Sequence, residues 1–276
     1  MNLPVVLSIA GSDNSAGAGA QADLKTISAL GTYGVTAITC VVAEVPGKVS
    51  AIQPIEPRIV AEQIRLLFEA FPISAVKTGM LYSREIIEAV ADSLQSTIRN
   101  PQSAIPLVVD PVMVATSGDP LLQRDAIALY RERLFPLAKV ITPNLDEAAV
   151  LLGRPIASLA EMRIAGRELA GLFRTAILLK GGHLREAIAT DLLFADDEVH
   201  EFTAPFVSGV TTHGTGCTYS AAIATSLGKG LPLRDAVGEA KRFVTDAITH
   251  FFRWTHHGRT TDALRHFAPD VALRIP

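Results

Sequence analysis

The stretch Thr212-His213-Gly214-Thr215-Gly216-Cys217-Thr218 joins a polar, strand-like run (199–210) to an apolar run of small residues (219–224) that is typical of a buried helix. Two glycines let the backbone turn tightly and let a ligand approach it closely. The N–H groups of 214–217 would lie at a helix N-terminus, where unpaired donors and the helix dipole favour an anion. Because a thiol lies in the same turn, the stretch suits transfer of a phosphoryl group to a hydroxyl. A glycine-rich turn whose Thr215 caps the helix explains the same residues without a ligand.

Outward from this stretch, apolar strand-like runs alternate with helical patterns along most of the 276 residues. This alternation predicts an α/β fold with a mostly parallel sheet covered by helices on both faces. No interior linker rich in Pro, Gly or Ser divides the chain, so we expect one domain over 1–276. The expected strands are 5–10, 33–45, 73–77, 106–110, 138–142 and 175–180, followed by a hairpin of 190–194 and 199–202. The first expected helix ends at 30. The others cover 59–71, 83–94, 126–134, 143–152, 164–173, 216–227 and 233–252, and a weakly patterned tail (254–276) follows.

The charge and cysteine content narrow the class of partner. The net charge is -3, which favours a small-molecule partner over nucleic acid or an anionic membrane. Two widely spaced cysteines, Cys40 and Cys217, suggest neither a disulfide framework nor a zinc site and fit a reducing cytoplasm. The N-terminus lacks a basic region before its apolar run, and no apolar run reaches the roughly 18 residues of a membrane span.

Polar residues gather where the expected strands end. In open parallel sheets the ligand crevice lies beyond the carboxyl ends of the strands, so these residues should share one crevice. They are Asp13, Glu44, Thr78 to Met80, Asp110, Asn144 and Lys180 to His183.

Oxygen ligands for a cation occur among them. Asp110, Asn144 and Glu147 could share a Mg²⁺ ion, which takes one or two carboxylates together with nucleotide phosphates. Asn144 and Glu147 also have the spacing of a capping box, which needs no metal. The two interpretations are compatible, because a capping carboxylate can also face a hydrated ion.

Two further groups suit a phosphate site. Lys180-Gly181-Gly182-His183 supplies a cation with flexible backbone beside it, whereas the Gly-Lys-Ser/Thr of a Walker-type loop is absent from the chain. A helix N-terminus should lower the pKa of the Cys217 thiol, and a bound phosphate would raise it again. A buried structural cysteine and a hydrogen-bonded loop histidine at His213 are the simpler alternatives.

The motifs together resemble those of the hydroxymethylpyrimidine/phosphomethylpyrimidine kinases of thiamin biosynthesis, in the ribokinase-like superfamily. The match runs from about Val5 to Phe252, with the motifs in the family's order. They are Gly11 to Asp13, Ala18 to Thr26, Val76 to Leu81, Val109 to Val114, Thr142 to Glu147, Lys180 to His183 and Thr212 to Thr218.

The resemblance implies a three-layer α/β/α sandwich, usually a homodimer, and ATP-Mg²⁺-dependent phosphorylation of a pyrimidine alcohol and then of its monophosphate. It implies that the amides of Gly214, Thr215 and Gly216 form the anion hole and that Cys217, Asp in many related kinases, is the catalytic base. The remaining implied roles follow the family's motifs. The pyrimidine pocket would contain Gly19, Asp23, Glu44 and Met80, the nucleotide region Thr142, Asn144, Lys180 and Gly182, and the metal site Asp110 and Glu147.

The sequence departs from the family pattern at several positions. Glu44-Val45-Pro46 replaces the usual Gln-Asn-Thr, while Thr116 and the pair Val210-Thr211 stand where the family has lysine and Lys-Asn. A neutral Gln both donates and accepts, whereas an ionised Glu only accepts. We therefore hypothesise that Glu44 binds a ring-protonated aminopyrimidine through a charge-assisted pair.

Two other functions stay open at this point. A pyridoxal or pyridoxine kinase would phosphorylate a similar ring alcohol, although Cys217 rather than Asp favours the pyrimidine. The replaced lysines and Glu44 would also suit a ligand-binding protein that has lost catalysis, but Asp110, Glu147 and the Gly-Thr-Gly-Cys turn oppose it.

Overall fold

A nine-stranded sheet organises the structure, a computed structural model that describes residues 3–98, 105–113, 122, 126–184, 187–210 and 213–267. The strand order is β3-β2-β1-β4-β5-β6-β7-β8-β9. The central strands run parallel, while β3, β8 and β9 are antiparallel to their neighbours at the two edges. The strands are β1 Val5–Asp13, β2 Tyr33–Val45, β3 Lys48–Pro54, β4 Ile73–Thr78, β5 Leu107–Val109, β6 Val140–Ile141, β7 Ala176–Lys180, β8 Ile188–Ala195 and β9 Glu198–Pro205.

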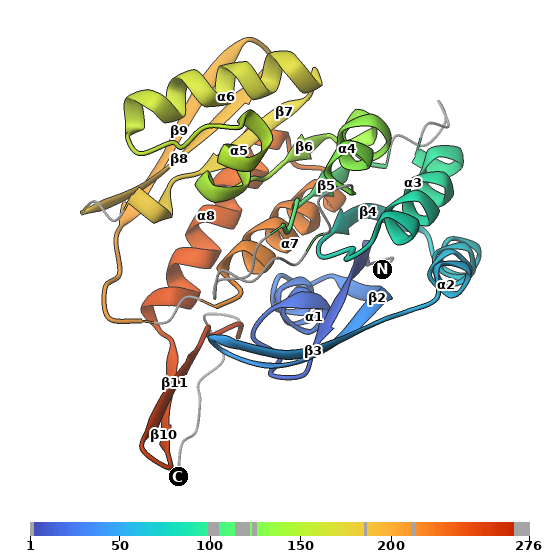
Figure 1. Cartoon of the computed structure of the whole chain (residues 1–276), viewed down its shortest axis with the longest axis horizontal. Helices are drawn as coiled ribbons and strands as arrows, with labels where there is room; N and C mark the ends of the chain where they lie inside the picture. Colours follow the sequence, from blue (N-terminus) through green and yellow to red (C-terminus); the bar gives the residue numbers. More distant parts are fainter. Residues whose placement is uncertain are drawn as a thin grey trace.

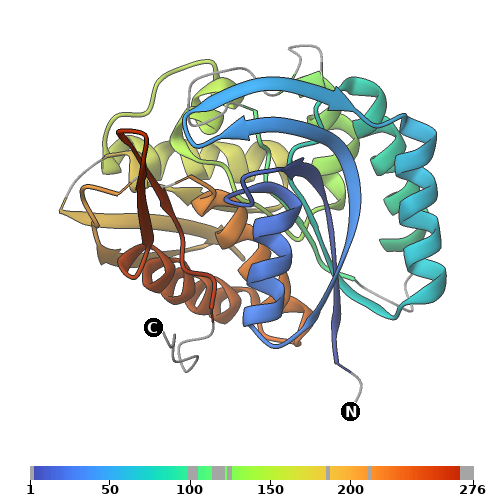
Figure 2. The ribbon, with the colours of Figure 1, turned by 90° about the horizontal axis from the view of Figure 1, so that it is seen from below.

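Helices cover both faces of the sheet, as Figures 1 and 2 show, so the predicted α/β/α sandwich is confirmed. Alternate strand residues explain the two layers, because successive side chains of a strand point to opposite faces. Val5, Leu7 and Ile9 belong to the core layer that contains side chains of α2 to α6, while Val6 belongs to the layer that contains side chains of α1, α7 and α8. The helices are α1 Gly19–Ala29, α2 Pro57–Ala70, α3 Arg84–Ile98, α4 Ala126–Leu129 (continued by a π turn, Tyr130–Leu134), α5 Leu145–Leu152, α6 Leu159–Phe173, α7 Thr215–Gly228 and α8 Leu233–Thr249.

Several local expectations were wrong. α6 begins at Leu159 rather than at 164, and α3 continues to Ile98 rather than ending at 94. β1 continues through Gly11 to Asp13 across an irregularity between Ala10 and Ser12. The strand β3, which forms a long curved ribbon with β2 (Figure 2), was not expected. α8 ends at Thr249, and the supposed tail begins with the hairpin β10 (Phe252–His256) and β11 (Arg259–Ala263), which projects from the body in Figure 1.

Among the described residues, no helix combines the length and apolarity needed to cross a membrane. The predicted hairpin of β8 and β9 is confirmed, with Asp196 and Asp197 at its turn. The carboxyl ends of β1, β2, β4, β5 and β7 lie at one edge of the sheet, next to the first turns of α1 and α7. This edge carries the candidate site.

Candidate active site

The turn before α7 has the geometry that the sequence predicted for an anion site. Gly214 occupies the N-cap with φ +82°, and a Cβ there would lie 1.8 Å from the Gly17 carbonyl oxygen, so only glycine fits. The Thr218 N–H donates to the Gly214 carbonyl at 2.9 Å, so the amides of Gly216 and Cys217 precede the first intrahelical bond. The expectation that Thr215 caps the helix was wrong, because Thr215 is its first residue.

Cys217 lies at the centre of a charged cluster. Burial raises the pKa of its thiol to about 11, against the opposing effects of the Lys77 charge and a hydrogen bond from the Gly19 N–H. The carboxylates Asp23 and Asp110 raise it further. The expected lowering of the thiol pKa by the helix N-terminus was therefore wrong: in this ligand-free protein desolvation outweighs the helix dipole.

A buried ion pair lies close enough to the Cys217 thiol for its charges to act on the thiol pKa. The Lys77 Nζ donates to both carboxylate oxygens of Asp23, at 3.0 and 2.8 Å, and the Ser8 hydroxyl donates to the same carboxylate. Both charged side chains are 0% exposed. Burial alone would lower the pKa of Lys77, but the Asp23 charge raises it above its usual range, so Lys77 stays cationic. Asp23 was expected to contact the pyrimidine; here its carboxylate is fully engaged by Lys77 and Ser8.

The sequence did not identify Lys77 as a functional residue. Its one signal was a lysine inside the otherwise apolar run of β4, which in a buried strand requires a partner. The partner, Asp23, lies 54 positions earlier and could not be read from spacing.

A second cation–carboxylate pair lies within electrostatic reach of Cys217. The Lys180 Nζ donates to Asp110 Oδ1 at 2.9 Å, Thr142 donates to the same oxygen at 3.0 Å, and Ser220 of α7 donates to Oδ2 at 3.1 Å. A Cβ on Gly216 would lie 3.3 Å from the Lys180 Nζ, which places this pair directly beside the anion turn. Burial raises the pKa of Asp110, but Lys180 and Lys77 together lower it below its usual value.

Asn144 and Glu147 form the predicted capping box. The Asn144 side chain accepts from the Glu147 N–H at 2.9 Å, and Glu147 accepts from the Asn144 N–H at 2.9 Å. Burial raises the pKa of Glu147 to about 7, with the nearby Asp110 charge adding to the effect and Lys180 opposing it. The paired carboxylates fit a Mg²⁺ ion, because they are oxygen donors whose mutual repulsion a cation would relieve. Both Asn144 and Glu147 take part in the cap, but Asp110 and Glu147 offer carboxylate oxygens whereas Asn144 offers a neutral amide, so the two acids are the better ligands.

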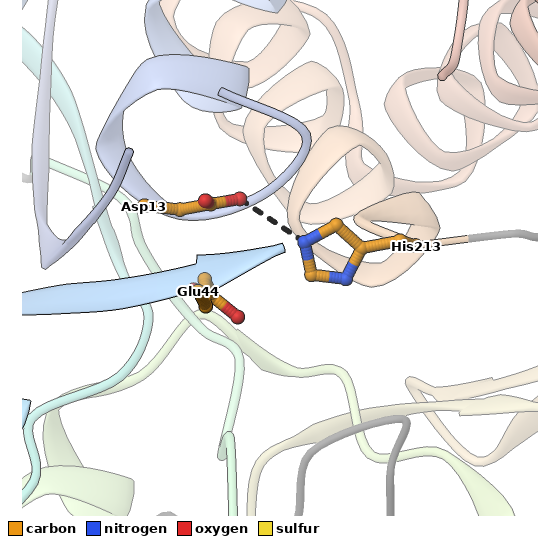
Figure 3. A group of neighbouring side chains, drawn as sticks. All are labelled: Asp13, Glu44 and His213. Atoms are coloured by element: carbon orange, nitrogen blue, oxygen red, sulfur yellow. Dashed lines mark hydrogen bonds and ion pairs between the residues drawn. The ribbon is translucent and has the colours of Figure 1, made fainter. Parts of the chain in front are cut away.

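The opposite side of the crevice contains the residues assigned to the substrate. Met80 is 8% exposed and packs with Cys40 and Val42 of β2. Glu44 is the penultimate residue of β2 and is half-buried rather than solvated, and its side chain lies beside Asp13 and His213 (Figure 3). Gly19 is at φ +58°, where a Cβ would lie 2.4 Å from the Gly11 carbonyl oxygen.

The remaining nucleotide-side residues are placed as follows. Gly182 begins a short 3-10 turn after β7, and a Cβ there would meet no atom of the described part of the chain within 4 Å. Val210 is half-buried before the anion turn. Thr116, Thr211 and Thr212 lie outside the described residues.

The sheet, the glycine-rich turn at the N-terminus of α7 and the paired cations and carboxylates beside it define a ribokinase-like small-molecule kinase. The sequence profile of the phosphomethylpyrimidine kinase family matches residues 13–262. The chain belongs to this family.

Three relatives illustrate the match. A hydroxymethylpyrimidine/phosphomethylpyrimidine kinase of Rhizobium meliloti is 46% identical over 269 residues, 91% of this chain and 98% of that protein. The thiamine biosynthesis bifunctional protein ThiED of Geobacter sulfurreducens is 46% identical over 243 residues, covering 88% of this chain, which spans 49% of that protein. The structure of Staphylococcus aureus pyridoxal kinase in complex with AMP-PCP and pyridoxal superposes with a TM-score of 0.85 at 32% identity, covering 98% of this chain and 96% of that one.

Proposed function

We propose that the protein phosphorylates 4-amino-5-hydroxymethyl-2-methylpyrimidine, its monophosphate, or both, with ATP, in thiamin biosynthesis. The observation that carries this proposal is the position of the Cys217 thiol at the N-terminus of α7, within the electrostatic reach of Lys77, Lys180 and Asp110. A hydroxyl group placed there would face a proton acceptor, amide donors and two cations at once, which is what in-line phosphoryl transfer requires.

In the proposed mechanism the substrate hydroxyl oxygen forms a bond to the γ-phosphorus of ATP, and the bond from that phosphorus to the β,γ-bridging oxygen breaks, leaving ADP. Cys217 in its thiolate form accepts the hydroxyl proton. The amides of Gly214, Thr215, Gly216 and Cys217 stabilise the charge of the phosphoryl oxygens. Lys77 stabilises the thiolate, since its charge lowers the thiol pKa against the burial that raises it.

For the nucleotide, we propose that Lys180 and the backbone at Gly182 contact the phosphates, with Thr142 and Asn144 shaping that side of the crevice. Asp110 and Glu147 would hold a Mg²⁺ ion, which when bound neutralises phosphate charge. Asp110 is already held in place by Thr142 and Ser220, so its carboxylate is oriented before any ligand arrives.

For the acceptor, we propose that the ring lies on Met80 beside Gly19, near the Asp23–Lys77 pair, with Glu44 pairing to the 4-amino group and the protonated ring nitrogen. The support is the Glu44 carboxylate, which accepts no hydrogen bond from a described residue and so keeps that capacity for a ligand while its charge also acts on His213.

A second substrate class is supported by the Staphylococcus aureus structure, a pyridoxal kinase of the same fold. We propose side activity on pyridoxal or pyridoxine as the alternative. We also propose that the protein works in the cytoplasm as a homodimer of single-domain subunits. The exposed apolar side chains Val41 and Val45 on the β2–β3 ribbon suit an interface with a second copy.

The test is a phosphotransfer assay with ATP and Mg²⁺ in which the pyrimidine alcohol, its monophosphate and pyridoxal are compared at equal concentration. The proposal expects the largest kcat/KM for one of the two pyrimidines. A larger value for pyridoxal would select the alternative, and turnover of none would refute both. Size-exclusion chromatography with light scattering decides the dimer.

A further inference from the structure

Three titratable side chains meet where β1, β2 and the turn before α7 come together. Asp13, Glu44 and His213 each place one polar atom within 4.8 Å of the others (Figure 3). The His213 Nε2 lies 3.0 Å from Asp13 Oδ2, and the imidazole is only 13% exposed. Of the three, only Glu44 was given a role above, as the proposed partner of the substrate ring.

This group is not built to hold a metal ion. Asp13 Oδ2 already accepts from the Gly17 N–H at 3.2 Å, the Ala18 N–H at 2.8 Å and the Ser15 hydroxyl at 3.0 Å, in addition to His213. Four donors therefore already share this one oxygen, and a metal ion bound to it would have to displace them. The arrangement instead suits a cation that donates hydrogen bonds, which is an imidazolium.

The surrounding charges favour the protonated form of His213. Burial alone would lower its pKa, but the hydrogen bond and charge of Asp13 and the charge of Glu44 raise it above the ordinary range. The other nearby cation is Lys25 of α1, which interacts with Asp13 and donates to the Ala16 carbonyl at 2.7 Å. No other described charged group acts on His213.

His213 also joins the turn before α7, whose amides form the candidate anion site, to the loop before α1. It directly precedes Gly214, the N-cap of α7, and its ring packs on Gly17, so that a Cβ on Gly17 would lie 2.7 Å from the ring. Asp13 holds the Gly17 and Ala18 amides on the other side of this contact. One carboxylate therefore joins the loop before α1 to the turn before α7.

We propose that His213 is a positioning residue whose imidazolium, held between the Asp13 and Glu44 carboxylates, fixes the turn that carries the α7 amides against the loop before α1. The expected effect on turnover rests on the proposed phosphoryl-transfer function. The ion pair of His213 with Asp13 and Glu44 does not depend on that function. Loss of the charge loosens the turn and misplaces the amides, and a misplacement of about 1 Å lowers turnover on the order of 10²-fold.

The first experiment is an NMR titration of the histidine side chains in the full-length protein, with His213 identified by the signal lost in His213→Gln. We expect the pKa of His213 to be raised in the wild type and lowered in Asp13→Asn, and by less in Glu44→Gln. A His213 pKa at or below the ordinary value of about 6.5, or one that neither substitution lowers, would overturn the proposal.

The second experiment compares turnover of the wild type and His213→Gln from pH 6 to 10. Glutamine can still donate to Asp13 but carries no charge. We expect the ratio of wild-type to variant kcat to be roughly 10 to 100 at low pH and to approach 1 as pH rises through the pKa of His213. A ratio that does not change with pH would overturn the proposal. His250→Gln, which removes the exposed His250–Asp246 pair of α8, is the matched control and should keep a ratio near 1 throughout.

If the wild type turns over none of the alcohols, the proposed function fails, and the titration alone decides whether His213 is the imidazolium that joins the two loops.

Discussion

The protonation state of Cys217 is the most direct test of how this site works. Burial raises the pKa of the thiol to about 11. At pH 7 the thiolate fraction is then about 10⁻⁴, compared with about 3% for an unperturbed cysteine. The thiolate fraction of Cys217 is therefore about 300-fold lower than that of an exposed cysteine, and burial is the cause. If the thiolate is the base, kcat should rise about tenfold per pH unit between pH 7 and 10.

The measurement has two parts. Thiolate absorbance at 240 nm is recorded against pH for the wild type and for Cys217→Ser, and the difference isolates this thiol from Cys40, whose pKa burial also raises to about 11. Turnover is recorded over the same range, with far-UV circular dichroism to confirm that the protein stays folded. Cys217→Ala should retain binding and lose about 10²–10⁴ in kcat, the usual worth of general-base help.

Two results would refute this reasoning. A thiolate that forms with a pKa below about 8.5 in the ligand-free protein would mean that the α7 N-terminus and Lys77 outweigh burial, contrary to the geometry. A loss of less than threefold in Cys217→Ala would remove this residue from the role of base, whatever its pKa.

Three more predictions follow from individual contacts. Glu44→Gln should abolish the fall in pyrimidine affinity above neutral pH, seen by calorimetry, because the wild-type carboxyl–ring pair must retain one shared proton to bind; unchanged pH dependence would contradict the charge-assisted pair. Lys77→Met should lower the free energy of unfolding, measured in urea, by about 3–5 kcal/mol, because it leaves the buried Asp23 carboxylate unpaired. Its control, Arg154→Met, breaks an exposed ion pair and should cost less than about 1 kcal/mol. Equal losses in the two variants would contradict the buried charge. Gly214→Ala should abolish turnover, since its Cβ would lie 1.8 Å from a carbonyl oxygen, whereas Gly153→Ala, at φ +71° in open space, should cost only the roughly 1–2 kcal/mol of backbone strain and keep its activity.

Strands and helices that pack one face on the core were predictable from the sequence, whereas the mostly exposed strands were missed. The range 33–45 was expected as a strand and is β2 to the residue, since its β-branched run packs on the core. β3 and the β10–β11 hairpin are mostly exposed, so no apolar alternation marks them. α8 was extended too far because Phe251 and Phe252 continue its apolar pattern, although the helix ends at Thr249.

The site was predictable as a set of strand-end residues but not in its electrostatics. Asp110, Asn144 and Lys180 lie at one edge because parallel strands end there, which the alternation of elements already implied. The pairing of Lys180 with Asp110 and of Lys77 with Asp23 depends on packing between residues far apart in the chain. The thiol pKa depends on the same packing, so a rule based on the helix N-terminus alone gave the wrong sign.

The charges of the crevice explain why Glu147 differs from its neighbours. Lys77 is matched by Asp23 and Lys180 by Asp110, each in a direct ion pair. Glu147 forms no direct ion pair with a described residue, and burial together with the Asp110 charge raises its pKa to about 7 although the Lys180 charge opposes the rise. A carboxyl that is half protonated near neutrality would release a proton when a cation binds, because the cation favours the ionised form. Among the described residues, three carboxylates (Asp23, Asp110 and Glu147) face two lysines, and this excess of negative charge gives a physical reason for a cation at this position.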